Sequence, residues 1–176
     1  PRPLDGLPPA AGPTVCVIPG AARGESKRWT GFAAAAKIVL GQCPDCRILV
    51  AGSANESTLC ARVAAEIGPG AANVAGRTSL AEFAALLGHC RLVLCNDSGG
   101  MHLASAAGVP VVAVYGLTDP DKTGPIWSCA TIVRAQGVRP SRDIARHSRA
   151  AVAALASITP EIVAEACMAT LRANAR

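Results

Sequence analysis

Aromatic residues and lysines are both scarce in this sequence. Phenylalanine, tryptophan and tyrosine together make up 3% of the 176 residues, and only three of the 17 basic residues are lysines. Proteins that bind nucleic acid by stacking bases use aromatic side chains for the bases and a stripe of basic residues for the backbone phosphates. We therefore expect no nucleic-acid partner, although the net charge is +5.

Long apolar runs and a secretory signal are also missing. The longest apolar stretches, such as GVPVVAVYG at residues 108–116, are shorter than the roughly 18 residues that a membrane-spanning helix needs. The chain opens without a basic segment followed by an apolar one, so nothing in it signals secretion. With 51% hydrophobic residues, the sequence predicts one soluble α/β domain with a sizeable core.

The first 13 residues are rich in proline and precede the first apolar run. This composition is typical of a linker. We therefore expect residues 1–13 to be the remnant of an interdomain linker and residues 14–176 to form one domain. Because the chain begins with Pro1 rather than methionine, we interpret it as a fragment of a longer protein.

Short apolar runs alternate with amphipathic segments after residue 13. The sequence predicts strands over residues 14–20, 47–52, 72–76, 91–97, 110–116 and 130–135, and helices over residues 26–42, 56–67, 79–89, 100–107 and 160–173. This alternation predicts a Rossmann-like parallel sheet with helices on both faces. Ligands bind such sheets beyond the carboxyl ends of the strands.

Eight cysteines allow a metal or redox hypothesis, but their spacing does not favour it. Cys43 and Cys46 form the one CxxC motif, and no second pair completes a zinc site. The others lie in apolar runs, where a free thiol behaves as a small hydrophobic group. We expect reduced structural cysteines and no metal.

Residues 96–102, NDSGGMH, place a polar, glycine-rich turn between an apolar run and a helix. Free backbone N–H groups at a helix start attract anions, and glycines allow a close approach. Ser98 adds a hydroxyl, and His102 lies one turn further on. Asp97 would repel a diphosphate, so we expect it to accept hydrogen bonds from sugar hydroxyls or to cap the helix. The alternative is a plain N-cap at Asp97 or Ser98, with His102 packed against a loop.

Two further turns supply charge. PGAARGESKRW, at residues 19–29, follows the first strand, and its Lys27 can neutralise phosphate oxygens, with Arg28 as the competing candidate. The spacing matches neither GxGxxG nor GxxxxGK[ST]. Glu56 follows the second strand, where a carboxylate can accept ribose hydroxyls or merely complement a helix dipole. The sequence DPD at residues 119–121 has the D-x-D pattern of a metal-bridged phosphate site, but we interpret it as an ordinary turn.

One stretch, residues 134–149, concentrates positive charge. Its arginines are Arg134, Arg139, Arg142, Arg146 and Arg149, around a single acid, Asp143. This segment is either a solvated face or a surface that attracts a phosphorylated acceptor or an anionic membrane.

Together these turns resemble the carboxyl-terminal half of the ADP-heptose:lipopolysaccharide heptosyltransferase family, glycosyltransferase family 9. The similar segments are IPGAARGESKRW, AGSANE, GRTSLAEFAALLGHCRLVLCNDSGGMHLASAAGVPVVAVYGLTDP and ITPEIVAEACMATL. The resemblance runs from about residue 15 to 171 and is thin between 127 and 157. It implies the donor-binding half of a GT-B enzyme. By motif position, the implied donor-binding residues are Lys27 at the diphosphate, Glu56 at the ribose, Thr78 at the adenine through its backbone, and Asp97, Ser98, Gly99, Gly100, Met101 and His102 at the heptose and phosphates.

The resemblance also implies an inverting transfer of heptose from ADP-heptose to a lipopolysaccharide core acceptor, with no cofactor and no catalytic metal. The catalytic base of such enzymes belongs to the amino-terminal half, so we expect this chain alone to be inactive. A cytoplasmic location follows, with peripheral contact at the inner face of the bacterial inner membrane as a further expectation. The alternatives are a non-catalytic nucleotide-binding module and a GT-B enzyme that uses another sugar nucleotide, such as a UDP-sugar epimerase or transferase.

Two positions depart from the family pattern. Ser26 stands before Lys27 where family members often have alanine, and GVRPSRDIARHSRAAVAALAS replaces a stretch rich in cysteine and proline. The second departure leaves the acceptor, and the exact sugar, open.

Overall fold

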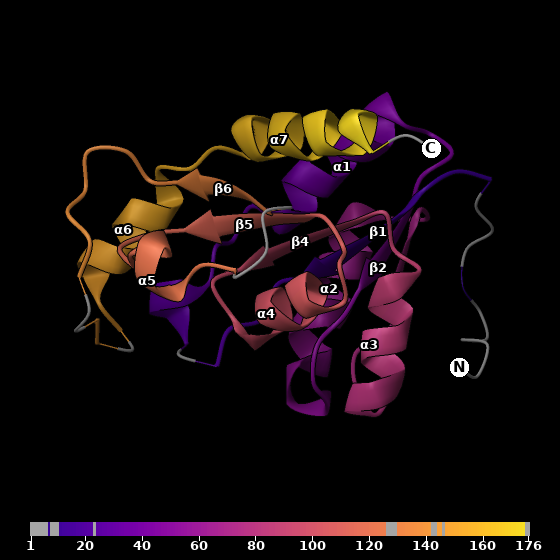
Figure 1. The fold of residues 1–176 in the computed structure, drawn as a ribbon, viewed down its shortest axis with the longest axis horizontal. Coiled ribbons are helices and arrows are strands. Elements are labelled where there is room, and N and C mark those ends of the chain that lie inside the picture. Colours follow the sequence, from indigo (N-terminus) through magenta and orange to yellow (C-terminus); the bar gives the residue numbers. More distant parts are fainter. Residues whose placement is uncertain are drawn as a thin grey trace.

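The computed structural model describes Leu7 and residues 11–22, 24–125, 130–141, 144–145 and 147–174. Within these residues, six strands form one parallel sheet in the order β3-β2-β1-β4-β5-β6 (Figure 1). The strands are β1 (Thr14–Ile18), β2 (Arg47–Val50), β3 (Ala71–Asn73), β4 (Leu92–Asn96), β5 (Val111–Tyr115) and β6 (Ala130–Arg134). The predicted α/β, Rossmann-like architecture is confirmed.

Helices connect the strands and cover the sheet. They are α1 (Phe32–Gln42), α2 (Ser57–Ile67), α3 (Leu80–Gly88), α4 (Gly99–Ala106), α5 (Pro120–Thr123), α6 (Arg149–Ala156) and α7 (Pro160–Ala173), with the short 3-10 helices η1 (Glu25–Lys27) and η2 (Ala54–Glu56). Ser79 caps α3 and forms a capping box with Glu82, in agreement with the local sequence. Proline at the first position of α7 fixes the start of that helix.

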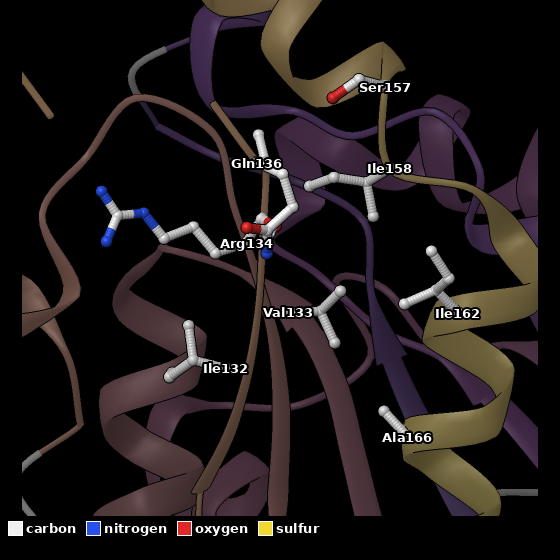
Figure 2. A pocket seen from close by; sticks show the side chains of 9 residues that line it. Ile132, Val133, Arg134, Gln136, Ser157, Ile158, Ile162 and Ala166 are labelled. Carbon is white, nitrogen blue, oxygen red and sulfur yellow. Dashed lines mark hydrogen bonds between the residues drawn. The ribbon is translucent and has the colours of Figure 1, made fainter. Parts of the chain in front are cut away.

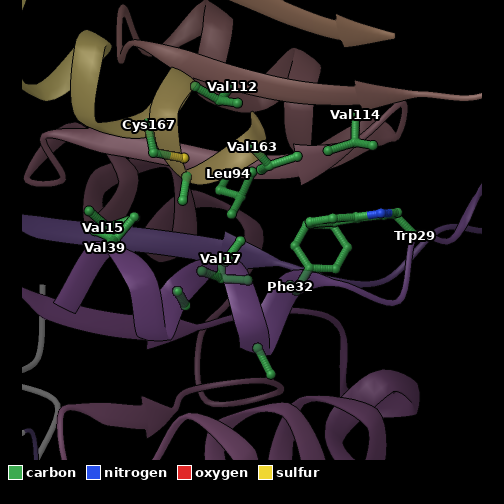
Figure 3. Close-up of a cluster of buried hydrophobic side chains, with 14 of the residues drawn as sticks. Val15, Val17, Trp29, Phe32, Val39, Leu94, Val112, Val114, Val163 and Cys167 are labelled. Atoms are coloured by element: carbon green, nitrogen blue, oxygen red, sulfur yellow. The ribbon is translucent and has the colours of Figure 1, made fainter. Parts of the chain in front are cut away.

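The two faces of the sheet bury separate hydrophobic clusters. Successive side chains of a strand point to opposite faces, so Val15 and Val17 of β1 pack with α1, α2, α6 and α7, whereas Cys16 and Ile18 pack with α3 and α4. Figure 3 shows the first cluster, where Phe32 and Trp29 meet edge to face with ring centroids 5.1 Å apart. Because both faces are covered, the strands are apolar almost throughout.

The closing helix α7 lies across the same face as α1, and the two pack against each other (Figure 1). Its buried side chains fill the first cluster: Val163, Ala164, Cys167, Met168 and Leu171. The end of the chain therefore stabilises the same layer as the helix that follows β1.

The prediction of one helix over residues 26–42 is wrong at its start. The chain forms η1, leaves helical geometry at Arg28, which is extended, and begins α1 only at Phe32. Tertiary hydrogen bonds cause the break, because the Trp29 backbone N–H donates to the Asn96 side-chain oxygen at 2.9 Å and its indole N–H donates to the Ile158 carbonyl at 3.0 Å.

Two short helices were not predicted. Residues 119–123 form a single turn, α5, that Asp119 caps rather than an open turn. The alanine-rich α6 is capped by the Ser148 side chain, which accepts from the Ala151 N–H. Figure 1 places both beyond the arrowheads of β5 and β6, at the edge where ligands bind such sheets.

Other predictions concern cysteines, membranes and charge. All seven cysteines in the described part are free, and six of them are buried. Among the described residues, no single helix is long and apolar enough to cross a membrane, and only α6 and α7 together, bent by 61°, reach that length and composition. Arg142, Arg146 and most of residues 1–13 lie outside the described residues, so those parts of the arginine and linker predictions stay predictions.

Candidate functional site

The order in which strands are added to the sheet reverses between β1 and β4. From β1 the chain moves outward through β2 to β3, then returns to place β4 on the other side of β1 and continues outward to β5 and β6. Loops from the two central strands diverge at such a point and leave a crevice above their carboxyl ends. The segments that follow β1 and β4 are residues 19–31 and 97–98. They carry Lys27, Asp97 and Ser98, and α4, which begins directly after them, carries four more of the predicted site residues.

Lys27 and Asp97 meet at this crevice. The Lys27 ammonium donates to an Asp97 carboxylate oxygen at 2.5 Å, although the residues are 70 positions apart in sequence. The side chains are 15% and 7% exposed, so the pair is largely shielded from water while the ammonium remains reachable from the rim. The structure thus brings together the predicted phosphate-binding lysine and the turn after β4.

Asn96 fastens the Lys27 loop to the end of β4. Its side chain is fully buried, and its amide NH2 donates to the carbonyls of Pro19 and Gly20 at 2.9 and 3.3 Å, while its oxygen accepts from the Trp29 backbone N–H. One side chain therefore holds both the start and the end of the loop. Sequence reasoning gave Asn96 no role, although a buried polar residue at the carboxyl end of a central strand is itself unusual.

The amino terminus of α4 faces the same crevice. Ser98 is the N-cap residue by its extended backbone, but its side chain makes no capping hydrogen bond, and its hydroxyl is buried without a partner among the described residues. The first turn contains no acidic residue. The macrodipole and the first N–H groups of α4 are thus left without a side-chain cap, which suits an anionic ligand.

The two glycines of α4 have different surroundings. A Cβ on Gly100 would lie 2.9 Å from Ile18 Cδ1, so glycine allows the helix to approach the end of β1 closely. A Cβ on Gly99 would meet nothing within 4 Å, and this residue is exposed. Gly99 therefore presents open backbone at the helix start.

Met101 and His102 point to different environments. The Met101 side chain is fully buried in the second cluster, where its sulfur lies 3.2 Å from the Tyr115 hydroxyl oxygen. That side chain has no surface for a ligand, so any contribution of Met101 to the site comes from its backbone. His102 is exposed. The N-cap position of α4 is Ser98, so the capping role considered for Asp97 is wrong.

Glu56 follows β2 and lies against Gly20, which belongs to the segment after β1. One oxygen accepts hydrogen bonds from the Ser53 backbone N–H and hydroxyl at 2.8 and 2.7 Å, in a capping box. The other oxygen lies against Gly20, where any Cβ would overlap it. The structural role of Glu56 is therefore satisfied by one oxygen. The second oxygen faces the segment after β1.

Thr78 is half-buried and lies directly before the N-cap of α3. The preceding turn approaches the β2 loop closely, because the Gly76 N–H donates to the Gly52 carbonyl at 3.1 Å and a Cβ on Gly76 would touch the Ala54 backbone at 2.9 Å. Gly76 also has φ +70°, which glycine adopts without strain. Thr78 and Glu56 thus belong to two loops in direct contact.

Thr123 and Tyr115 complete the surroundings of Asp97. The Thr123 hydroxyl donates to the Asp97 carboxylate at 3.4 Å, and the Tyr115 hydroxyl donates to the Thr123 carbonyl at 3.1 Å. Burial raises the pKa of the Tyr115 phenol above its ordinary value, and the negative charge of Asp97 adds a smaller increase. Tyr115 therefore stays a neutral donor that fixes α5 beside Asp97.

A separate cavity of about 350 Å³ lies between β6 and α7. Figure 2 shows Ile158, Ile162 and Val133 around it, with Ile162 53% exposed. None of the predicted site residues lines this cavity. Among the described residues, no group of three or more His, Cys, Asp or Glu side chains is placed to hold a metal ion. The expectation of a metal-free site stays a prediction.

Comparison with known proteins decides the family. Residues 4–152 match the family model described as glycosyltransferase family 9 (heptosyltransferase). The chain belongs to glycosyltransferase family 9.

Curated and solved proteins are similar to most of this chain. The lipooligosaccharide heptosyltransferase 2 of Haemophilus influenzae is 34% identical over 128 residues, which cover 69% of this chain and 36% of that protein. The lipopolysaccharide heptosyltransferase 2 of Escherichia coli strain K12 is 33% identical over the same coverage. The solved E. coli ADP-heptose lipopolysaccharide heptosyltransferase II superposes with a TM-score of 0.76 at 28% identity, over 93% of this chain and 48% of that one. The chain thus spans between about a third and half of these family 9 proteins.

Proposed function

We propose that this family 9 chain binds the sugar-nucleotide donor ADP-heptose, and that the protein transfers the heptose to a lipopolysaccharide core acceptor. One observation carries the proposal: the Lys27 ammonium contacts Asp97, the residue before the N-cap of α4. The contact lies where the segments after β1 and β4 meet, and the strand order of the sheet reverses between these two strands. The names of the relatives support the donor and acceptor classes, and a solved E. coli heptosyltransferase, 23% identical, contains ADP.

In this proposal the diphosphate lies between Lys27 and the first N–H groups of α4. Exchange of the Lys27–Asp97 contact for a Lys27–phosphate contact leaves Asp97 beside the sugar, where its oxygens accept hydroxyl hydrogen bonds. The free oxygen of Glu56 accepts from the ribose, and the backbone at Thr78 borders the adenine. His102, exposed and one turn into α4, donates to a phosphate or sugar oxygen.

The transfer itself is a displacement at the anomeric carbon. The acceptor hydroxyl oxygen forms the new bond as the bond from that carbon to the diphosphate oxygen breaks, and ADP leaves with the extra negative charge. Lys27 and the α4 amides stabilise this leaving group because they are already in place before the charge develops. With the donor bound, the Asp97 oxygens accept from the sugar hydroxyls and from the Thr123 hydroxyl, so we assign the acceptance of the acceptor's proton to a base outside this chain. By itself, the chain is expected to bind the donor without turnover.

Calorimetric titration of the chain with ADP, and separately with UDP, tests this function. We expect saturable binding of ADP with a dissociation constant below about 1 mM, and at least tenfold weaker binding of UDP. Magnesium chloride should leave the ADP affinity unchanged when the donor site needs no metal. A folded chain that binds neither nucleotide, or that prefers UDP, contradicts the proposal. The second result favours a GT-B enzyme of different donor specificity.

A further inference from the structure

Ser26, the residue before Lys27, is tied to a distant part of the chain. Its hydroxyl donates to the Ala145 carbonyl at 2.5 Å and accepts from the Ser148 backbone N–H at 2.9 Å. The side chain is 3% exposed. Both hydrogen-bonding capacities of the hydroxyl are therefore used across more than 100 residues of sequence, in a place shielded from water.

Ser26 is the buried anchor of η1. Within this three-residue helix its side chain is the one that is buried, and η1 packs against α6. The neighbouring contact between Glu25 and His147 spans 3.5 Å, but both side chains are more than half exposed, so it holds the helix weakly. Trp29, bonded to Asn96, fixes the far end of the loop. The position of Lys27 thus depends on Ser26 on one side and on the Asn96 clamp on the other.

We propose that Ser26 is a positioning residue: by joining the Lys27 loop to the chain at Ala145 and Ser148, it holds the Lys27 ammonium where the donor diphosphate binds. This inference rests on the proposed donor site. It makes Ala145 and Ser148, which lie between β6 and α6, part of the structure that supports donor binding. Donor affinity then depends on residues far from Lys27 in sequence.

A double-mutant cycle with ADP titration tests the inference. Ser26→Ala removes both hydrogen bonds, and we expect the dissociation constant for ADP to rise about fivefold, the loss that one buried hydrogen bond ordinarily causes. In a Lys27→Ala background the same substitution should change the constant less than twofold, because there is no ammonium left to position. A general loss of structure would instead weaken binding by the same factor in both backgrounds.

Ser157→Ala is the matched control. The exposed Ser157 hydroxyl donates to the Ala154 carbonyl at 2.7 Å at the other end of α6, so this variant loses a local serine hydrogen bond of the same helix without touching η1. It should bind ADP like the unaltered chain. Ser26→Thr, which keeps the hydroxyl, should bind more tightly than Ser26→Ala.

If Ser26→Ala does not fold, hydrogen exchange in the unaltered chain decides the question. Saturation with ADP should slow exchange of the Ser148 amide at least about threefold, because binding and loop ordering are linked. Unchanged exchange at Ser148, or equal ADP affinity of Ser26→Ala and the unaltered chain, overturns the inference while the donor site stands. Absence of ADP binding by the unaltered chain overturns both.

Discussion

Replacement of Lys27 by alanine is the perturbation with the most definite expected size. The ammonium lies 2.5 Å from Asp97 and is 15% exposed, so it acts in a partly desolvated place. A hydrogen bond to a charged group in such a place contributes about 1.5–3 kcal/mol. Because Lys27 leaves Asp97 to meet the diphosphate, the net contribution lies at the lower end, about 1.5–2 kcal/mol. The dissociation constant for ADP should therefore rise about 10- to 30-fold.

Calorimetry of Lys27→Ala against Lys37→Ala measures this difference. Lys37 is an exposed residue of α1, so its removal changes the net charge equally without altering the crevice. Lys27→Ala also removes the cationic partner of the buried Asp97 carboxylate, which keeps the Thr123 hydroxyl at 3.4 Å, and it should lower the free energy of unfolding by about 1–3 kcal/mol. Urea denaturation separates that loss from the loss of binding. Equal ADP affinity of Lys27→Ala and Lys37→Ala, with both proteins folded, would refute the assignment of Lys27 to the diphosphate.

The remaining predictions concern helix α4, the Asn96 clamp and the buried thiols. Gly99→Ala should weaken ADP binding and change stability by less than about 0.5 kcal/mol, whereas Gly100→Ala, whose Cβ would lie 2.9 Å from Ile18, should cost about 1–2 kcal/mol of stability; calorimetry and urea denaturation check this, and equal effects contradict it. Asn96→Ala leaves three backbone groups unpaired and should lower the free energy of unfolding by about 2–4 kcal/mol; a loss under about 1 kcal/mol contradicts the clamp. Burial raises the pKa of the Cys60 thiol from 9.0 to about 11, so above pH 9 the unfolded chain releases a proton that the folded chain keeps. The urea midpoint should therefore fall as the pH rises from 9 to 11, and it should fall less in Cys60→Ala.

The sheet could be predicted from the sequence because its strands are short, apolar and separated by helical patterns. Burial on both faces makes such runs continuous in hydrophobic residues, and each of the six predicted ranges overlaps a strand, although β3 ends at Asn73 rather than at residue 76. The start of α1 could not be predicted from the sequence, because residues such as Arg28 and Trp29 are common in helices. Its geometry is decided by hydrogen bonds to Asn96 and Ile158, which lie far away in sequence.

The site was predictable in its residue types and less so in its contacts. The glycine-rich turn after β4 and the lysine after β1 are local features, and the parallel sheet brings them to one edge. Spacing alone did not indicate that Asp97 would pair with Lys27, because that contact depends on the path of the whole loop. Met101 was predicted as a site residue because it belongs to the motif, but helical periodicity turns its side chain into the core.

A crystal structure of the chain with ADP tests the central claim most directly. The account predicts the diphosphate within hydrogen-bonding distance of Lys27 Nζ and of the backbone N–H groups at Gly99 and Gly100, with the ribose toward Glu56. Nucleotide density elsewhere, for instance in the cavity between β6 and α7, with the Lys27–Asp97 contact unchanged, would contradict it.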